Sequence, residues 1–230
     1  MDLFENKNCL VTGATGGLGI EIAKEMANKR VNLFLTGRNN EKLKALKEEL
    51  AGYNVFCQEA DFNSLKDIND LIDGFKEIDI LINCAGIFPV KSLIDSTIED
   101  YEKCFNVNVR APIFLSKAFS KRMIEKKWGR IVNIASSSAY GGFSNTSLYC
   151  ASKHALLGFS RSIFKELKDY NVRVYCVSPG SIKTEMGEDV LNQDFETFID
   201  PKEIAQYVSF LMSFDANLIS EEIKLNRLFI

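Results

Sequence analysis

Short runs of apolar and β-branched residues recur along the chain, separated by longer segments in which apolar residues return every three or four positions. Within each short run the apolar residues are nearly consecutive, which is typical of strands buried on both faces of a sheet. The runs cover residues 9–11, 31–35, 55–57, 78–82, 131–134, 172–177 and 222–225. The pattern therefore predicts about seven strands.

The segments between these strands have the period of amphipathic helices. Leu18, Ile22 and Met26 are spaced four apart, as on one helix face. Ser64 precedes another such segment, with Asp67 placed as its capping-box partner. Alternating strands and helices with short connections predict an α/β, doubly wound parallel sheet, the Rossmann fold, with helices on both faces. Such sheets bind ligands at the carboxyl ends of their strands.

Length and composition fit one globular unit. The chain has 230 residues, 46% of them hydrophobic and 26% charged, which is ordinary for a packed domain. Its four prolines stand singly, and no Pro/Gly-rich linker divides it. We expect a single domain over residues 1–230.

Charge and the absence of targeting signals exclude several partners. The 28 Lys and Arg against 31 Asp and Glu give a net charge of −3, so no basic field attracts nucleic acid. No apolar run approaches the roughly 20 residues that span a bilayer, and residues 1–5 lack the basic start and apolar stretch of a signal peptide. We expect a cytoplasmic protein that binds neither nucleic acid nor membrane.

The cysteines do not form a metal-binding pattern. No two have C-x-x-C spacing, and His154 is the sole histidine of the sequence. We expect no metal, and we expect reduced, mostly buried thiols. The six cysteines are Cys9, Cys57, Cys84, Cys104, Cys150 and Cys176.

A glycine-rich loop follows the first predicted strand directly and opens the first helix. Backbone N–H groups and the positive end of the helix dipole meet there, which makes an anion site. Gly13 suits a tight turn, Gly17 the close approach of a pyrophosphate, and Gly19 close packing of the helix on the sheet. The loop reads Thr12-Gly13-Ala14-Thr15-Gly16-Gly17-Leu18-Gly19. In this strand–loop–helix setting, Gly13 and Thr15 to Gly19 predict dinucleotide binding.

The end of the second strand indicates which dinucleotide binds. A carboxylate there would hold the ribose 2′-hydroxyl of NAD. This chain has Thr36-Gly37-Arg38 instead. A carboxylate would repel a 2′-phosphate, whereas Arg38 can donate charge-assisted hydrogen bonds to it. The sequence therefore favours NADP(H) as the cofactor; the alternative is a solvated surface arginine.

Several motifs, in this order, resemble those of the short-chain dehydrogenase/reductase family over nearly the whole chain. The glycine loop is similar to T-G-x-x-x-G-x-G, and residues 83–86, Asn-Cys-Ala-Gly, are similar to N-N-A-G with Cys84 in place of the second Asn. Residues 178–184, Ser-Pro-Gly-Ser-Ile-Lys-Thr, resemble the P-G-x-x-x-T segment beside the nicotinamide. The positions of the catalytic tetrad hold Asn108, Ser136, Tyr149 and Lys153.

The resemblance implies an oxidoreductase that transfers a hydride between a nicotinamide and a carbonyl compound or secondary alcohol. It also implies a homodimer or homotetramer, although residues 220–230 lack the D-G-G end common among tetrameric members. The cofactor contacts that it implies beyond the glycine loop are Asp61 and Phe62 at the adenine, Asn83, Ala85 and Gly86 near the ribose, Tyr149 and Lys153, and Pro179, Gly180, Ile182 and Thr184 at the nicotinamide.

Tyr149 and Lys153 are four residues apart and share one helix face. Proton exchange near neutral pH asks for a phenol pKa about 3 units below its ordinary ~10, or about 4 kcal/mol. A cation about 4 Å away supplies ~1 kcal/mol in bulk water and ~4 kcal/mol at an effective dielectric constant of ~20. We therefore expect a water-poor cleft in which Lys153 lowers the pKa of Tyr149. Ser136, with Ser138 as its rival, would donate to the developing oxyanion, and the resemblance implies that Asn108 holds a relay water.

The favoured function is NADP(H)-dependent reduction of a neutral carbonyl compound. The expected substrate lid, around residues 185–199, has several carboxylates and no Lys or Arg, which disfavours an anionic substrate. Aromatic residues in the segments after strands four, five and six are candidates for lining the substrate pocket, with core packing as the alternative for each: Phe88, Tyr140, Phe143 and Phe195. One alternative is a 3-oxoacyl-[acyl-carrier-protein] reductase, with Lys127 as a carrier-docking candidate but Tyr170 where another basic residue is expected. The other is a non-catalytic NADP(H)-sensing binding protein.

Overall fold

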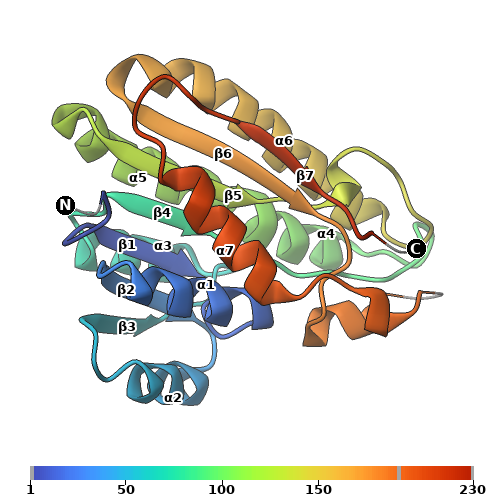
Figure 1. The fold of residues 1–230 in the computed structure, drawn as a ribbon. Helices are drawn as coiled ribbons and strands as arrows, with labels where there is room; N and C mark the ends of the chain where they lie inside the picture. Colours follow the sequence, from blue (N-terminus) through green and yellow to red (C-terminus); the bar gives the residue numbers. More distant parts are fainter. Residues whose placement is uncertain (1–2, 191–192, 229–230) are drawn as a thin grey trace.

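The structure, a computed structural model, describes residues 3–190 and 193–228. Within them, seven parallel strands form one sheet in the order β3-β2-β1-β4-β5-β6-β7 (Figure 1). The predicted doubly wound α/β sheet is confirmed, and every predicted strand is present. Positions 191 and 192 of the expected lid, 1 and 2 of the N-terminus and 229 and 230 of the tail lie outside the described residues. The strands are β1 (Asn8–Thr12), β2 (Asn32–Gly37), β3 (Val55–Glu59), β4 (Ile80–Asn83), β5 (Gly129–Ile134), β6 (Val172–Pro179) and β7 (Glu222–Leu225).

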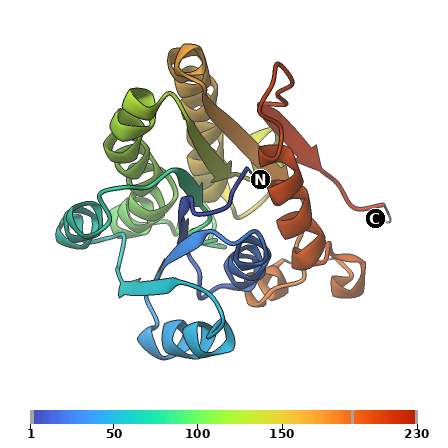
Figure 2. The same cartoon turned by 60° about the vertical axis from the view of Figure 1, so that its left-hand side comes forward.

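Helices cover both faces of the sheet (Figures 1 and 2). Side chains of α1, α2 and α7 pack on one face, and those of α3, α5 and the end of α6 pack on the other. The helices are α1 (Gly17–Asn28), α2 (Asn40–Glu49), α3 (Leu65–Gly74), α4 (Ile98–Phe105), α5 (Ala111–Lys126), α6 (Ser147–Leu167) and α7 (Pro201–Met212). The short helices are the π-helix η1 (Asn106–Arg110) and the 3₁₀ turns η2 (Ser137–Ala139), η3 (Lys168–Tyr170), η4 (Glu185–Asp189) and η5 (Phe195–Thr197).

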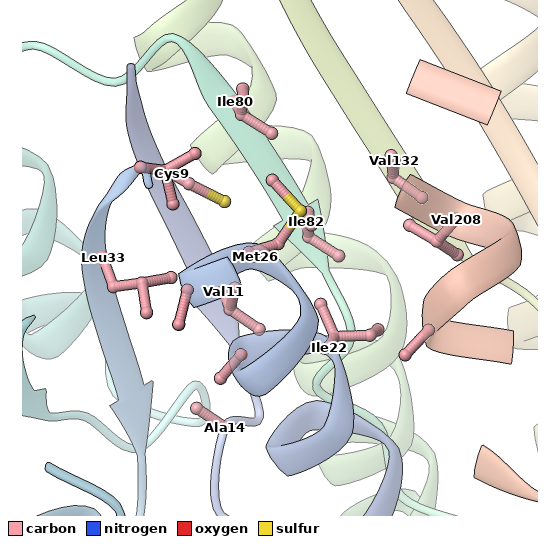
Figure 3. Close-up of a cluster of buried hydrophobic side chains, with 14 of the residues drawn as sticks. Cys9, Val11, Ala14, Ile22, Met26, Leu33, Ile80, Ile82, Val132 and Val208 are labelled. Atoms are coloured by element: carbon pink, nitrogen blue, oxygen red, sulfur yellow. The ribbon is translucent and has the colours of Figure 1, made fainter. Parts of the chain in front are cut away.

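The hydrophobic core divides into two layers because successive strand residues point to opposite faces. In β1, Cys9 and Val11 belong to the layer beneath α1, whereas Leu10 belongs to the layer beneath α5. Figure 3 shows the first layer, where Ile22 and Met26 of α1 meet the side chains of the central strands. Burial of both faces explains why the strands read as nearly continuous apolar runs.

Side chains at helix starts decide where several helices begin. Ser64 caps α3 as predicted, since its hydroxyl accepts from Asp67 N–H at 3.2 Å. The predicted capping box is incomplete, because the Asp67 carboxylate does not accept from Ser64 N–H. It accepts instead from Asp61 N–H at 2.9 Å. Ser64 N–H is not available to Asp67 because it donates to the Asp61 carbonyl oxygen at 2.9 Å. A complete capping box joins Thr97 and Asp100 at α4 instead.

The strand order fixes where a ligand can enter. The chain runs outward from β1 to β3, then returns to place β4 on the other side of β1. Loops after β1 and β4 therefore leave the sheet in opposite directions, which opens a crevice at the carboxyl ends of these two strands.

The cysteines are reduced, and the helices that the structure describes are not suited to span a membrane. All six cysteines are free; Cys57 and Cys84 are partly exposed and the other four are buried, as predicted. In the described part of the chain, no helix combines the length and the apolar composition needed to span a bilayer.

We expect Ile22→Ala to lower the free energy of unfolding by about 2–5 kcal/mol, because it leaves a cavity beneath α1. Ile22 is 1% exposed. Ile94→Ala deletes the same atoms from a residue that is 95% exposed and should change the free energy by less than about 0.5 kcal/mol. Urea unfolding followed by circular dichroism measures both; equal losses would contradict the assigned core.

Candidate active site

A cleft of about 870 Å³ runs past the loops that follow β1 to β6. It brings together most of the residues predicted for the site. Those lining it are Gly13, Thr15, Gly16, Gly17, Leu18, Gly19, Arg38, Asp61, Phe62, Ala85, Gly86, Ser136, Tyr149, Lys153, Pro179, Gly180, Ile182 and Thr184. Asn83 and Asn108 lie behind its wall, as described below.

The glycine loop is tied directly to the loop after β4. The Thr12 hydroxyl accepts from the N–H groups of Cys84 at 3.0 Å and Ala85 at 3.1 Å. Gly13 has a φ of 67°, and a Cβ there would lie 2.7 Å from Ala85 Cα. Both the left-handed conformation and the close approach therefore require glycine at position 13.

Gly17 and Gly19 also allow close contacts, but the partner of Gly19 is not the predicted one. A Cβ at Gly19 would overlap the Gly13 carbonyl oxygen, so Gly19 packs the first turn of α1 on its own loop rather than on the sheet. A Cβ at Gly17 would lie 2.7 Å from Thr184 Cγ2. Gly16, the N-cap residue of α1, has no side chain to accept from the first-turn N–H groups, so the positive end of α1 faces the cleft.

At one end of the cleft, Arg38 lies beside two residues that the sequence reasoning missed, Asn39 and Lys42. Asn39 caps α2 by accepting from Lys42 N–H at 2.9 Å, and Lys42 Nζ lies 3.5 Å from a carboxylate oxygen of Glu185. Arg38 forms no salt bridge with any residue that the structure describes. An Asn directly before a helix rich in Lys and Glu is an N-cap signal that would have located both missed residues.

Carboxylates lie on the other side of Arg38. Glu59, Asp61, Asp67 and Asp70 line a smaller hollow of about 440 Å³ with it. Two of them already accept hydrogen bonds: Asp61 from Asn63 N–H at 3.0 Å, and Asp67 from Asp61 N–H. Arg38 therefore lies between these acids and the main cleft.

Helix α6 carries Tyr149 and Lys153 on one buried face, as their spacing predicts. They are 8% and 4% exposed. Lys153 Nζ lies 5.6 Å from the centroid of the Tyr149 ring and donates to the carbonyl oxygen of Ile134, the last residue of β5, at 2.9 Å. The two side chains thus lie together where β5 meets the cleft.

The pKa values of Tyr149 and Lys153 shift in opposite directions. Burial raises the pKa of Tyr149 to about 12, a rise that a hydrogen bond with Ser136 opposes. Burial lowers the pKa of Lys153 to about 8. The expected lowering of the Tyr149 pKa is therefore wrong. The reason is that burial penalises the charged form of each group, which raises the pKa of a phenol and lowers that of an ammonium.

The structure distinguishes the two candidate serines. Ser136 is the serine that lies close enough to Tyr149 to lower the pKa of its phenol. Its hydroxyl also accepts from Ser138 N–H at 3.1 Å, which begins the turn η2. Both serines line the cleft, but Ser136 lies nearer to the phenol.

Asn108 lies in the π-helix η1 and is fully buried. Its side-chain oxygen accepts from Ile87 N–H at 2.9 Å, and its amide nitrogen donates to the Ile87 carbonyl at 3.0 Å and to Ser152 Oγ at 3.0 Å. A Cβ at Gly86 would lie 3.5 Å from Asn108 Oδ1 and 3.7 Å from Lys153 Nζ. Asn108 therefore positions the segment after β4 and has its oxygen near Lys153.

Asn83, which the resemblance places near the ribose, turns its side chain into the core. It is 2% exposed and donates to Asn133 Oδ1 at 2.8 Å. The side chain points away from the cleft because it follows the alternation of β4, while Ala85 and Gly86 beyond the strand line the cleft.

The segment after β6 forms the opposite wall. Gly180 N–H donates to the Leu225 carbonyl of β7 at 2.8 Å, and Ile182 forms a parallel bridge with Ile199. Thr184 caps η4, accepting from Gly187 N–H at 3.3 Å. Pro179, Gly180, Ile182 and Thr184 are thereby fixed along the cleft.

Comparisons with known proteins identify the family. Residues 7–194 match the family model described as short chain dehydrogenase. The 3-oxoacyl-[acyl-carrier-protein] reductase of Aquifex aeolicus is 34% identical over 96% of this chain and 95% of its own length. A metagenomic short-chain oxidoreductase in complex with NADP has a TM-score of 0.86 at 28% identity, covering 98% of this chain and 99% of that one. A 4-hydroxyisoleucine dehydrogenase complexed with NADH has a TM-score of 0.89 at 28% identity, covering 96% and 98%.

The chain belongs to the short-chain dehydrogenase family. It is an oxidoreductase with a Rossmann-like fold, and a nicotinamide cofactor is the group that this family binds. The residues present fit such a group: the uncapped start of α1 suits a pyrophosphate, and the cleft extends from Arg38 to the buried pair Tyr149 and Lys153.

We expect Lys153→Met to change how the free energy of unfolding depends on pH. Native Lys153, with its pKa lowered from 10.5 to about 8, loses its proton at lower pH than the unfolded chain does. Its contribution to stability therefore rises with pH between these values, by about 1 kcal/mol from pH 7 to pH 9. Urea unfolding should show this rise in wild type relative to Lys153→Met. Lys165→Met, at an exposed position of α6, should behave as wild type; identical pH profiles for wild type and Lys153→Met would contradict the burial of a charged lysine.

Proposed function

We propose that this protein reduces neutral carbonyl compounds with NADPH, and that Tyr149, Lys153, Ser136 and Asn108 carry the reaction. The observation that supports this most directly is the buried Tyr149–Lys153 pair on one face of α6, beside a cleft that begins at an uncapped glycine-rich helix start. Reduction is the direction proposed for a cell.

Tyr149 acts as the general acid. A phenol with a pKa of about 12 is fully protonated at neutral pH, so it holds the proton that a carbonyl oxygen needs. A bound nicotinamide supplies the hydride. Ser136, which lies beside Tyr149, donates to the same oxygen as negative charge develops on it. Phenol and hydroxyl therefore converge on one atom of the substrate.

Lys153 holds the ribose hydroxyls of the cofactor and stabilises the phenolate that forms. Its ammonium is largely protonated at pH 7, since its pKa lies at about 8. Asn108 supports reprotonation: its side-chain oxygen and Lys153 Nζ both lie within 4 Å of the position that a Cβ of Gly86 would take. A water held by these two groups would connect Lys153 to solvent.

Arg38 is proposed as the residue that selects NADP(H), with Asn39 and Lys42 as further contacts to the 2′-phosphate. These three residues line the same end of the cleft, and two of them are cations. The acids behind Arg38 oppose a phosphate, but Asp61 and Asp67 already accept hydrogen bonds, which reduces their effect. Relatives in complex with NADP and with NADH both exist, so the choice depends on this end of the cleft.

We expect Arg38→Ala to weaken NADPH binding about tenfold or more while NADH binding stays nearly unchanged, because the variant loses charge-assisted hydrogen bonds to the phosphate alone. Fluorescence titration with each nucleotide measures this. Arg30→Ala removes an exposed arginine outside the cleft and serves as the control. A preference for NADH that Arg38→Ala leaves unaltered would contradict the assignment.

A 3-oxoacyl-[acyl-carrier-protein] reductase is the second candidate, because a relative with that activity is 34% identical. Two observations weigh against it. Residues 185–190 and 193–199 add carboxylates but no cation to the mouth of the cleft. Lys127 and Tyr170 lie just before β5 and β6, at the amino ends of these strands, whereas the cleft lies at the carboxyl ends.

We expect Tyr149→Phe to lower kcat by about 10²–10⁴, since it deletes the general acid and little else, and to bind NADPH as wild type does. Loss of NADPH absorbance with simple diketones and with an acetoacetyl thioester measures turnover, and preference for the thioester would favour the second candidate. Activity of Tyr149→Phe within a few-fold of wild type would require another acid. NADPH binding by wild type with no turnover of any carbonyl compound would favour a cofactor-sensing protein.

A homodimer or homotetramer in the cytoplasm completes the proposal. Ile98 and Tyr101 of α4 and Phe114 of α5 are 78%, 47% and 43% exposed, which supports association through these helices. Light scattering counts the subunits.

Residues 185–199 are proposed as the substrate lid, since η4 lies along the cleft beside Thr184.

A further inference from the structure

The ring of Phe88 packs edge-on against Tyr149. The two ring centroids are 4.7 Å apart and the ring planes meet at 76°, a T-shaped contact. Phe88 also lines the cleft, so its remaining surface is half-buried and faces the space beside the proposed acid. A substrate whose carbonyl oxygen reaches Tyr149 must therefore pass next to this ring.

Phe88 is held in place from both sides although it lies in a segment without regular secondary structure. On one side, Asn108 bonds both backbone polar groups of Ile87, at 2.9 Å and 3.0 Å. On the other, Lys91 N–H donates to the Asn145 carbonyl at 2.6 Å, which joins this segment to the one before α6. The backbone on both sides of Phe88 is therefore held to neighbouring segments.

Neutral side chains surround Phe88. The cations lining the cleft in the described part of the chain are Arg38 and Lys42 at the far end, and Lys153, whose ammonium donates to the Ile134 carbonyl oxygen. The residues lining the cleft in the segment of Phe88 and in the segment before α6 that is joined to it are the apolar Val90 and Phe143 and the neutral polar Ser144, Asn145 and Thr146. This end suits a neutral group attached to the carbonyl carbon.

We propose that Phe88 is the specificity-determining residue of the substrate end, and that it favours carbonyl compounds and alcohols with a flat aromatic ring next to the reacting carbon. The inference rests on the proposed function for the position of that carbon. A planar ring can stack on or meet the edge of the Phe88 ring, whereas a saturated ring of similar size gains only the burial of its surface. Asn108 then acts on specificity as a positioning residue, through Ile87.

The test compares 1-phenylethanol with 1-cyclohexylethanol, which differ in the ring alone. Calorimetric titration of the protein saturated with NADP⁺ gives the dissociation constant of each. We expect wild type to bind the phenyl compound more tightly, and Phe88→Leu to reduce this preference about twofold to tenfold, the range that aromatic pairing contributes. Phe88→Tyr keeps the ring and should keep the preference.

Phe210→Leu is the matched control, because Phe210 also forms a T-shaped ring pair, with Phe214 at 5.1 Å, but is 56% exposed on α7 and does not line the cleft. It should leave the preference unchanged. An unaltered preference in Phe88→Leu, an equal loss in Phe210→Leu, or failure of wild type to bind either alcohol would overturn the proposal. If the binding preference behaves as expected but wild type reduces neither matching ketone with NADPH, the proposed function fails and the role of Phe88 in binding stands.

Discussion

One hydroxyl, that of Thr12, joins the two halves of the sheet at the edge where the cleft lies. It accepts from the successive N–H groups of Cys84 and Ala85 and lies 3.4 Å from the Ile82 carbonyl, to which it donates. The loops after β1 and β4 would otherwise diverge, since the chain leaves these strands in opposite directions. Their attachment lets Gly13 contact Ala85 and brings the glycine loop beside the segment that carries Phe88.

Burial is the second constraint, and it acts in both directions. The same exclusion of water that strengthens electrostatic interactions at Tyr149 and Lys153 makes their charged forms costly before anything binds. Lys153 donates to the Ile134 carbonyl oxygen, which offsets part of the cost of burying its ammonium. Burial of these two groups makes the site less stable than an apolar core would be.

Much of this organisation could be read from the sequence. The apolar runs predicted all seven strands, and the spacing of Tyr149 and Lys153 predicted their common face, because both depend on local periodicity. The orientation of Asn83 and the side-chain bonds of Asn108 could not be predicted, since they depend on which side of β4 a residue faces and on a π-helix that has no evident sequence signal. The predicted direction of the Tyr149 pKa was wrong because burial of the phenol raises it, and the extent of that burial depends on the segments packed around α6.

The contact between Lys42 and Glu185 has a consequence for anions that enter the mouth of the cleft. It spans from α2 to η4, and the two side chains are 53% and 88% exposed, so it contributes at most about 1 kcal/mol. So weak an ion pair is readily exchanged: an anionic group that enters this end of the cleft can replace the Glu185 carboxylate at the Lys42 ammonium. The strength of this competition depends on ionic strength, because both side chains are exposed to solvent.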